Sequence, residues 1–191
     1  MAQPGQSIAN PVTGERVVFR TTSAESDGAL LAMDYYAPAG YVIAPTHVQP
    51  RQEERSEVSA GTLRGHIGGH KRTVAPGEAA VVPPGVRHAW RNVAQEELAM
   101  LVEFRPALQT ERLLEAFFAL ARAGRTNRRG MPAPLQIAVL LEDHLEETCA
   151  PAVPIAIQRA IVGSLAAVGR RRGYRPADAL LRHEADRSGG G

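Results

Sequence analysis

The residues best suited to chemistry in this chain are two histidines, a glutamine and a glutamate: His47, Gln49, Glu54 and His88. Imidazole nitrogens and carboxylate or amide oxygens are all ligands that bind metal ions in proteins. In an extended strand, residues two apart point to the same face, so His47 and Gln49 would project together. Pro45 and Pro50 flank this segment and favour an extended backbone, and Glu54, five residues after Gln49, can return from a bend onto the next strand. We therefore expect these side chains to converge on one metal ion.

Glycines and prolines frame these residues in a regular pattern. The first segment reads Gly40-x6-His47-x-Gln49-x4-Glu54-x6-Gly61, and the second reads Gly77-x5-Pro83-x-Gly85-x2-His88-x3-Asn92. Glycines let strands bend, and the Pro83-Pro84-Gly85 turn is rigid enough to deliver His88 on a new strand. The pattern predicts four side chains entering one mouth of a β-barrel.

The donor set limits the metal. If Gln49 does not bind it, two histidines and one carboxylate remain, a triad that suits Fe(II) and dioxygen chemistry. Mn, Ni, Co and Zn are alternatives to Fe, which we favour, whereas a single carboxylate argues against a Ca or Mg cage. Glu53 is an alternative ligand by register, but strand alternation favours Glu54.

Several other residues have weaker claims to function. His66 shares a strand face with Arg64 and is expected to point to solvent, and His144 is expected on an exposed helix face among acidic residues. Gly65 either leaves room for a substrate or bends its strand. Two interpretations stay open for four more residues. Met33, Tyr35 and Phe104 either line a pocket or pack in the core, and Arg87 either contacts an anionic substrate or lies exposed in a turn.

Composition excludes several classes of protein. The 191 residues are 44% hydrophobic and carry a net charge of +2, with arginines clustered near residues 125–129 and 170–175 rather than spread along a face. That distribution argues against nucleic-acid binding. The single cysteine, Cys149, excludes an internal disulfide. There is no signal pattern and no apolar stretch of membrane-spanning length, so we expect a cytoplasmic protein.

The hydrophobic period changes near Pro106. Short alternating segments with Gly/Pro turns precede it and predict an all-β sandwich or barrel. Helical periodicity follows, and predicts helices from residue 108 to about 124, from 135 to 148 and from 154 to about 172. The last helix is apolar on one side and ends in arginines. We expect it to pack on the barrel or across a dimer interface, in preference to lying on a membrane surface.

The two framed segments resemble the signature motifs of the cupin superfamily. His47, Gln49 and Glu54 fall on the first motif's His, His and Glu, and His88 falls on the His of the second, which matches fully. The resemblance implies a cupin-type (jelly-roll) β-barrel over residues 1–106. We expect a helical extension over 107–182, a disordered tail over 183–191 and a homodimer. The departure at Gln49 matters, because an amide is a weaker ligand than imidazole.

The resemblance implies a metal-dependent enzyme acting on a small organic molecule by dioxygenase-like, lyase, isomerase or cyclase chemistry. In that hypothesis Glu54 is both a ligand and the candidate catalytic residue. The alternative is a non-catalytic cupin that binds a small ligand beside a degenerate metal site. An interaction protein that uses the Arg-rich helical half is a third hypothesis, since the fold alone does not decide among them.

Overall fold

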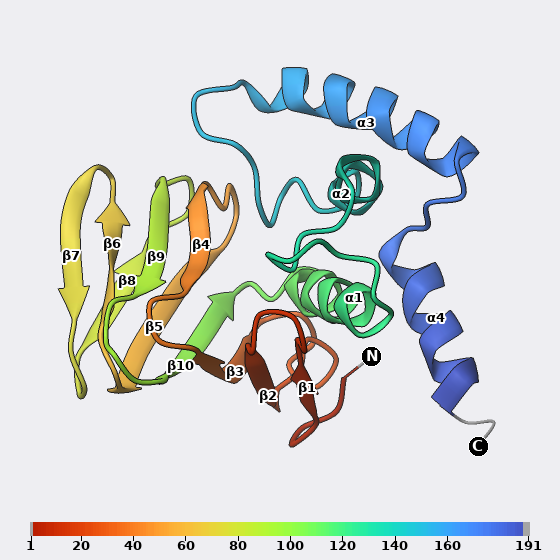
Figure 1. Ribbon diagram of the computed structural model, residues 1–191. Coiled ribbons are helices and arrows are strands. Elements are labelled where there is room, and N and C mark those ends of the chain that lie inside the picture. The colour runs from red at the N-terminus through yellow and green to blue at the C-terminus, as the bar shows by residue number, and fades with distance from the viewer. Residues whose placement is uncertain (1, 189–191) are drawn as a thin grey trace.

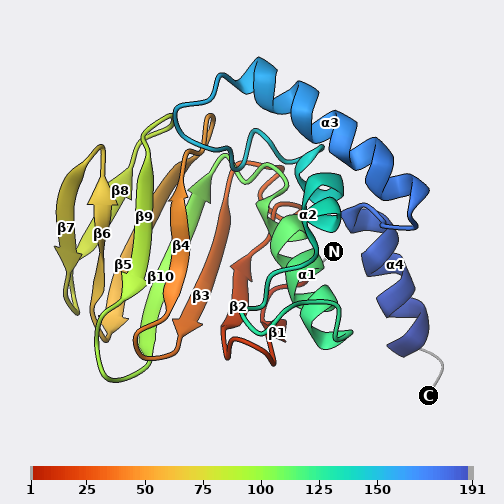
Figure 2. The same cartoon turned by 45° about the horizontal axis from the view of Figure 1, so that its top comes forward.

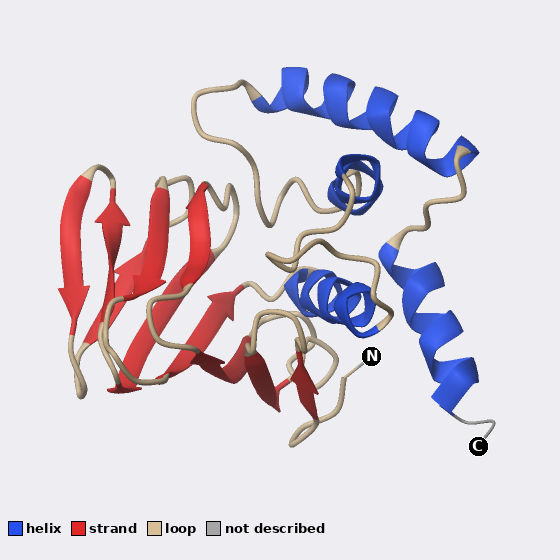
Figure 3. Ribbon diagram, viewed as in Figure 1, coloured by secondary structure: helices blue, strands red, loops and turns tan. Residues whose placement is uncertain are grey.

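Two antiparallel β-sheets followed by helices make up the protein (Figures 1 and 3). A computed structural model describes residues 2–188, and the side chains of residues 2–182. The strands are β1 (Ser7–Ala9), β2 (Arg16–Thr21), β3 (Leu31–Ala37), β4 (Val42–His47), β5 (Glu53–Ala60), β6 (Leu63–Ile67), β7 (His70–Val74), β8 (Ala79–Val82), β9 (His88–Asn92) and β10 (Leu98–Arg105). The helices are α1 (Thr110–Arg122), α2 (Pro134–Leu141), α3 (Ile155–Arg171) and α4 (Ala177–Ser188). The predicted mainly β fold with C-terminal helices is confirmed.

The sheets have six and four strands. Their orders are β1-β2-β3-β10-β5-β8 and β4-β9-β6-β7. Strands far apart in the chain are therefore neighbours, as in a jelly roll. Figure 2 shows the smaller sheet in front of the larger one, with the helices beside one end of the sandwich.

Strand alternation decides which residues of β5 enter the space between the sheets. Glu54, Ser56 and Val58 are buried, whereas the intervening residues are partly exposed. On β10, the paired positions Phe104, Val102 and Met100 are buried on the same side. The prediction that Glu54 rather than Glu53 faces inward is borne out by this pattern.

In the smaller sheet, β6 forms a hairpin with β7 and pairs on its other side with β9. Ile67 pairs with His70 around Gly68 and Gly69, both of which have positive φ. His70 therefore begins a strand. Gly65 does not leave room for a substrate, because a Cβ there would lie 1.7 Å from the carbonyl oxygen of Ala89. It permits close approach of β6 and β9.

Helix α1 belongs to the barrel's core as well as to the helical region. Phe118 lies in the main hydrophobic cluster, with Leu114 and Phe117 packed against it. On its other side, α1 contributes Leu113, Ala116 and Leu120 to a second cluster with residues of α2 and α4. The helical region is thus packed on the barrel through one shared helix. Among the described residues, no helix is both long and apolar enough to cross a membrane.

Two expectations about the helical region were wrong. The helix expected over residues 135–148 ends at Leu141, and the chain then turns so that Glu147 accepts a hydrogen bond from the backbone N–H of Gln109. His144 is consequently buried at 2% exposure and does not lie on a solvated helix face. Tertiary contacts outweigh the local helical pattern here.

The tail expected to be disordered over residues 183–191 is helical as far as Ser188, because α4 runs over Ala177–Ser188. Ala177 and Leu180 anchor the start of this helix in the second hydrophobic cluster. Residues 189–191, to which the same expectation applied, lie outside the described residues.

Candidate metal centre

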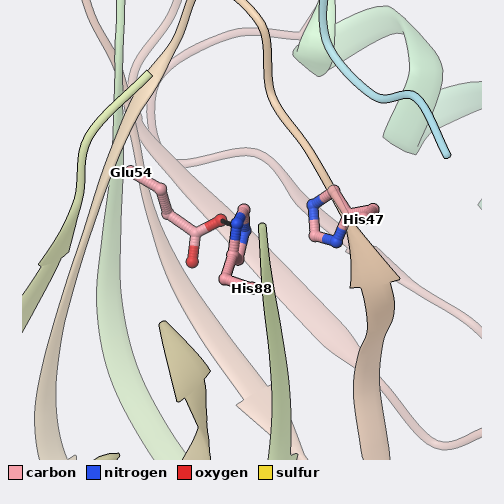
Figure 4. A group of neighbouring side chains, drawn as sticks. All are labelled: His47, Glu54 and His88. Atoms are coloured by element: carbon pink, nitrogen blue, oxygen red, sulfur yellow. Dashed lines mark ion pairs between the residues drawn. The ribbon is translucent and has the colours of Figure 1, made fainter. Parts of the chain in front are cut away.

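Three of the predicted ligands converge between the sheets (Figure 4). His47 lies at the end of β4, Glu54 near the start of β5 and His88 at the start of β9. One ligand atom from each residue lies within 4.8 Å of those from the other two, so the three side chains are close enough together to hold one metal ion. The glutamate and His88 are buried at 6% and 1% exposure.

The two histidines are register partners. His47 pairs with His88 across β4 and β9, and their ring centroids lie 4.2 Å apart. The Nδ1 atom of His47 lies 2.9 Å from the carbonyl oxygen of Pro45, and that of His88 lies 3.0 Å from the carbonyl oxygen of Val86. A carbonyl can only accept, so each Nδ1 carries a proton and donates it. Each neutral ring then presents the Nε2 lone pair to a ligand, as metal-binding histidines do.

The carboxylate of Glu54 is held by its neighbours. Trp90 Nε1 donates to Oε1 at 2.8 Å, and Ser56 Oγ donates to the same oxygen at 3.3 Å. Gln49 Nε2 donates to Oε2 at 3.1 Å. The Oε2 atom also faces His88 Nε2 at 3.4 Å. One oxygen is thus fixed by Trp90 and Ser56, while the other points toward the imidazoles.

Two buried polar atoms of the described residues lack hydrogen-bond partners at this point: His88 Nε2 and Gln49 Oε1. A neutral His88 places a lone pair against a carboxylate oxygen, an arrangement that repels unless a cation or proton lies between them. Buried polar atoms without partners are uncommon, and a bound ion is one of the accepted reasons for them. The residues present therefore fit a metal ion, with Gln49 in reach as a fourth donor.

The electrostatics of the three groups are coupled. Burial and the neighbouring His88 lower the pKa of His47 below its usual value. Burial alone would lower the pKa of His88, but the Glu54 carboxylate outweighs it and raises that pKa. Burial would likewise raise the pKa of Glu54, but the neighbouring His88 outweighs burial and lowers that pKa. The three groups therefore shift one another's pKa values, and the closest of these contacts joins His88 and Glu54.

A cavity of about 160 Å³ adjoins the cluster. It is smaller than the pockets that hold drug-sized ligands, so a bound molecule would be small. Its wall is mostly apolar and includes Met33, Tyr35 and Phe104, which also belong to the main hydrophobic cluster, so both roles left open by the sequence apply to them. Two residues of α1, Thr110 and Leu114, complete the wall, so the helical region contributes to this cavity.

Backbone hydrogen bonds fix the segment that carries His47 and Gln49. Val48 exchanges two backbone hydrogen bonds with Cys149, each 2.9 Å long. The Gln49 carbonyl accepts from the backbone N–H of Gly85 at 2.8 Å. This segment therefore lies between the turn before β9 and a loop from the helical region.

Some functional candidates were not anticipated from the sequence. The described cavity wall also contains Glu15, and Trp90 and Ser56 hold the Glu54 carboxylate. The place of Ser56 follows from alternation with Glu54, and that of Trp90 from alternation with His88. Nothing in the Thr13-Gly14-Glu15 segment indicates that its carboxylate would lie inside the barrel.

The remaining candidates lie away from the cluster. His66 is exposed, as expected, and so is Arg87. The buried His144 lies in the helical region, where its Nδ1 is 2.6 Å from the carbonyl oxygen of Leu140. None of these three lines the cavity beside the cluster among the described residues.

Comparison with known proteins identifies the barrel. Residues 35–104 match the sequence model of the family described as Cupin domain, so this part of the chain is a cupin domain. An RmlC-like cupin from Shewanella frigidimarina is 19% identical, over 58% of this chain and 94% of that one, with a TM-score of 0.48. No curated protein gives a significant match.

Two further solved structures similar to parts of this chain are described as enzymes. The DMSP lyase DddQ from Ruegeria pomeroyi is 32% identical, over 43% of this chain and 41% of that one, with a TM-score of 0.38. A predicted oxalate decarboxylase from Thermotoga maritima is 17% identical, over 53% of this chain and 90% of that one, with a TM-score of 0.46.

Proposed function

We propose that the protein is a metal-dependent cupin enzyme that acts on a small organic molecule. The observation that carries this proposal is the buried His88 Nε2, which faces Glu54 Oε2 at 3.4 Å without a hydrogen-bond partner. His47, Glu54 and His88 would hold a divalent transition metal, with Gln49 as fourth donor. Iron is favoured, and Mn, Ni, Zn and Co fit the same donors.

Neighbouring residues fix the orientation of the three proposed ligands. Val86 and Pro45 fix the tautomers of the imidazoles, and Trp90 fixes the carboxylate of Glu54. Glu54 lines the cavity and would touch a bound molecule, which supports its assignment as the catalytic residue. When bound, the metal would polarise a substrate oxygen or activate water or dioxygen. We favour dioxygenase-type chemistry over lyase, isomerase or cyclase chemistry, because two histidines and one carboxylate suit Fe(II).

A second candidate function is a non-catalytic cupin that binds a small ligand. The hydrogen bond from Gln49 Nε2 to Glu54 Oε2 favours it, because this amide engages one carboxylate oxygen without any metal. In that case the cavity would still hold a small molecule, but the histidines would serve only in packing and hydrogen bonding.

Metal content distinguishes the metal-dependent enzyme from the non-catalytic ligand-binding protein. We expect near-stoichiometric transition metal in the untagged wild-type protein by mass spectrometry, and none in His88→Ala or in the His47→Ala/His88→Ala double variant. Both variants should remain folded by circular dichroism. His66→Ala is the matched control, because His66 is exposed on β6. Retention of metal by His88→Ala would refute the ligand assignment, and a metal-free wild type even after reconstitution would favour the second function.

We further propose that the protein is a homodimer. The described part of α3 presents four exposed aliphatic side chains at helical spacing: Ile157, Ile161, Leu165 and Val168. Contiguous exposed apolar surface of this kind is typical of an interaction site. The cytoplasmic location expected from the sequence stays a prediction.

A further inference from the structure

A second polar group lies in the cavity wall, outside the His/Glu/His cluster. Glu15 directly precedes β2 and is buried at 7% exposure. It lines the same cavity as His47 and Glu54. The proposed metal site makes no use of it.

The hydrogen bonds to the carboxylate of Glu15 all come from neutral hydroxyl groups. Tyr35 donates a hydrogen bond to Oε1. Tyr41 and Thr13 both donate to Oε2, and each of these two bonds is 2.7 Å long. Burial and the carboxylate raise the pKa of both tyrosines, which keeps them protonated as donors. Three donors leave one of the roughly four acceptor positions of a carboxylate unfilled.

The negative charge of this group has no cationic counterpart in the cavity wall. Among the described residues that line the cavity there is neither lysine nor arginine. A buried carboxylate is costly unless it is paired, and hydrogen bonds from neutral hydroxyls meet only part of that cost. A ligand that brings a positive charge would supply the missing partner.

The rest of the wall suits an organic cation better than a hydrated inorganic one. The aromatic rings of Tyr35, Trp90 and Phe104 line the cavity together with methionine and aliphatic side chains. Aromatic faces attract ammonium groups, and most strongly where water is excluded. An apolar wall also excludes the hydration shell that a small metal cation would retain.

Strand register sets the Glu15 group apart from the metal cluster. Tyr35 pairs with Met100 on β10, whereas Glu54 pairs with Phe104, four residues further along the same strand. The cavity therefore has an anionic end at Glu15 and, once a divalent ion is bound, a cationic end at the histidines. A molecule with an onium group at one end and an oxygen at the other would match both.

We propose that this cavity binds a small organic ammonium compound, with the ammonium group against Glu15 and a hydroxyl or carboxylate oxygen toward the metal cluster. The second half of this assignment rests on the proposed function, and the first half does not. The inference follows from a buried carboxylate with only neutral partners in an aromatic and aliphatic cavity.

Choline and its uncharged carbon isostere, 3,3-dimethylbutan-1-ol, provide the test, because they differ in charge and hardly in shape. We expect choline to bind the wild-type protein about tenfold more tightly or better, by isothermal titration calorimetry. In Glu15→Gln the preference for choline should fall markedly, to what the aromatic rings alone provide. In Glu25→Gln, which alters an exposed carboxylate outside the cavity wall, the preference should persist.

Equal affinity of the two compounds for the wild-type protein, or binding of neither, would overturn the proposal. So would an unchanged preference for choline in Glu15→Gln. The wild-type comparison needs no variant, so it remains decisive even if Glu15→Gln fails to fold.

Titrations of metal-free and metal-loaded protein separate this proposal from the previous one. A choline preference in a protein that takes up no metal would leave the Glu15 assignment standing and refute the metal enzyme. Stoichiometric metal without a preference for choline would refute the Glu15 assignment and leave the metal-dependent enzyme standing.

Discussion

At the scale of single residues, the orientation of the proposed ligands depends on neighbouring residues outside the His47/Glu54/His88 cluster. Trp90 Nε1 donates to Glu54 Oε1 at 2.8 Å in a buried position. Such a hydrogen bond orients the carboxylate, and loss of partners of this kind typically lowers metal affinity by about 10- to 100-fold. We expect this loss in Trp90→Phe, measured by competition with a chromogenic chelator.

The control for Trp90→Phe is Ser56→Ala. Ser56 Oγ donates to the same oxygen over a longer distance, 3.3 Å, so its removal should reduce affinity less. Thermal unfolding of both variants should remain cooperative. Unchanged affinity in Trp90→Phe would show that the indole packs in the barrel without orienting Glu54.

Tyr35, the buried tyrosine that donates to Glu15, makes the free energy of unfolding depend on pH in the alkaline range. Burial and the Glu15 carboxylate raise the pKa of Tyr35 in the folded protein well above its value of about 10 in an unfolded chain. The unfolded state therefore loses the proton first, and the stability due to neutral Tyr35 is complete below about pH 10 and lost as the pH rises toward the folded pKa.

We expect the wild-type free energy of unfolding to fall more steeply above about pH 10 than that of Tyr35→Phe, by at most about 1.4 kcal/mol per pH unit. Urea titrations followed by the fluorescence of Trp90, the single tryptophan, would measure it. The variant should be less stable at neutral pH, because it leaves a Glu15 oxygen without its donor. Identical alkaline slopes would contradict the raised pKa.

At the scale of elements, two glycines of α3 have opposite roles in packing. A Cβ at Gly169 would lie 2.7 Å from Val139 Cγ2 and 2.9 Å from the backbone oxygen of Leu135, so this glycine allows α2 and α3 to approach closely. A Cβ at Gly163 would meet only Glu142 Oε1, at 4.0 Å. Glycine in a helix otherwise costs about 0.5–1 kcal/mol relative to alanine.

Gly163→Ala should therefore stabilise the protein by roughly 0.5–1 kcal/mol, and Gly169→Ala should destabilise it by about 1–3 kcal/mol through overpacking. Thermal or urea unfolding of the two variants measures both effects in one helix. Stabilisation by Gly169→Ala would mean that α2 and α3 separate without cost.

The strands and the cluster were predictable because their signals are local. Alternation places Glu54 inside and Glu53 outside, and the Pro/Gly frames deliver His47 and His88 to paired strands. The end of α2 and the burial of His144 were not predictable, because both depend on contacts with distant segments of the chain. The position of Glu15 in the cavity wall was not predictable for the same reason, because its partners Tyr35 and Tyr41 are 20 and 26 residues away in the sequence.

At the scale of the whole molecule, the helical region and the barrel share a core and a cavity. Leu114 of α1 packs against the main hydrophobic cluster and lines the cavity. A loop from the same region pairs with Val48, next to His47 and Gln49. Arg51, on the same stretch of chain, forms a 2.6 Å ion pair with Glu146 of that region. The division at Pro106 is therefore a change of secondary structure within one packed unit, and we propose that the two parts unfold together.

The outer face of α3 is where this unit would meet another copy of itself. Ile157, Ile161, Leu165 and Val168 are 41–52% exposed along one face, and no described segment covers them. Because aliphatic surface is buried favourably when two copies meet, we expect a dimer by sedimentation velocity at micromolar concentration. Ile161→Glu/Leu165→Glu should be monomeric, since charges in an apolar interface are costly to bury.

The control for this double variant is Ala156→Glu, which adds a charge at an exposed position on another side of α3 and should remain dimeric. Metal content should be the same in all three proteins, because the cluster lies inside the barrel. A monomeric wild type would contradict the homodimer. If that monomer also sedimented with anionic vesicles, the apolar face and the adjoining Arg171 and Arg172 would instead form a membrane-surface helix.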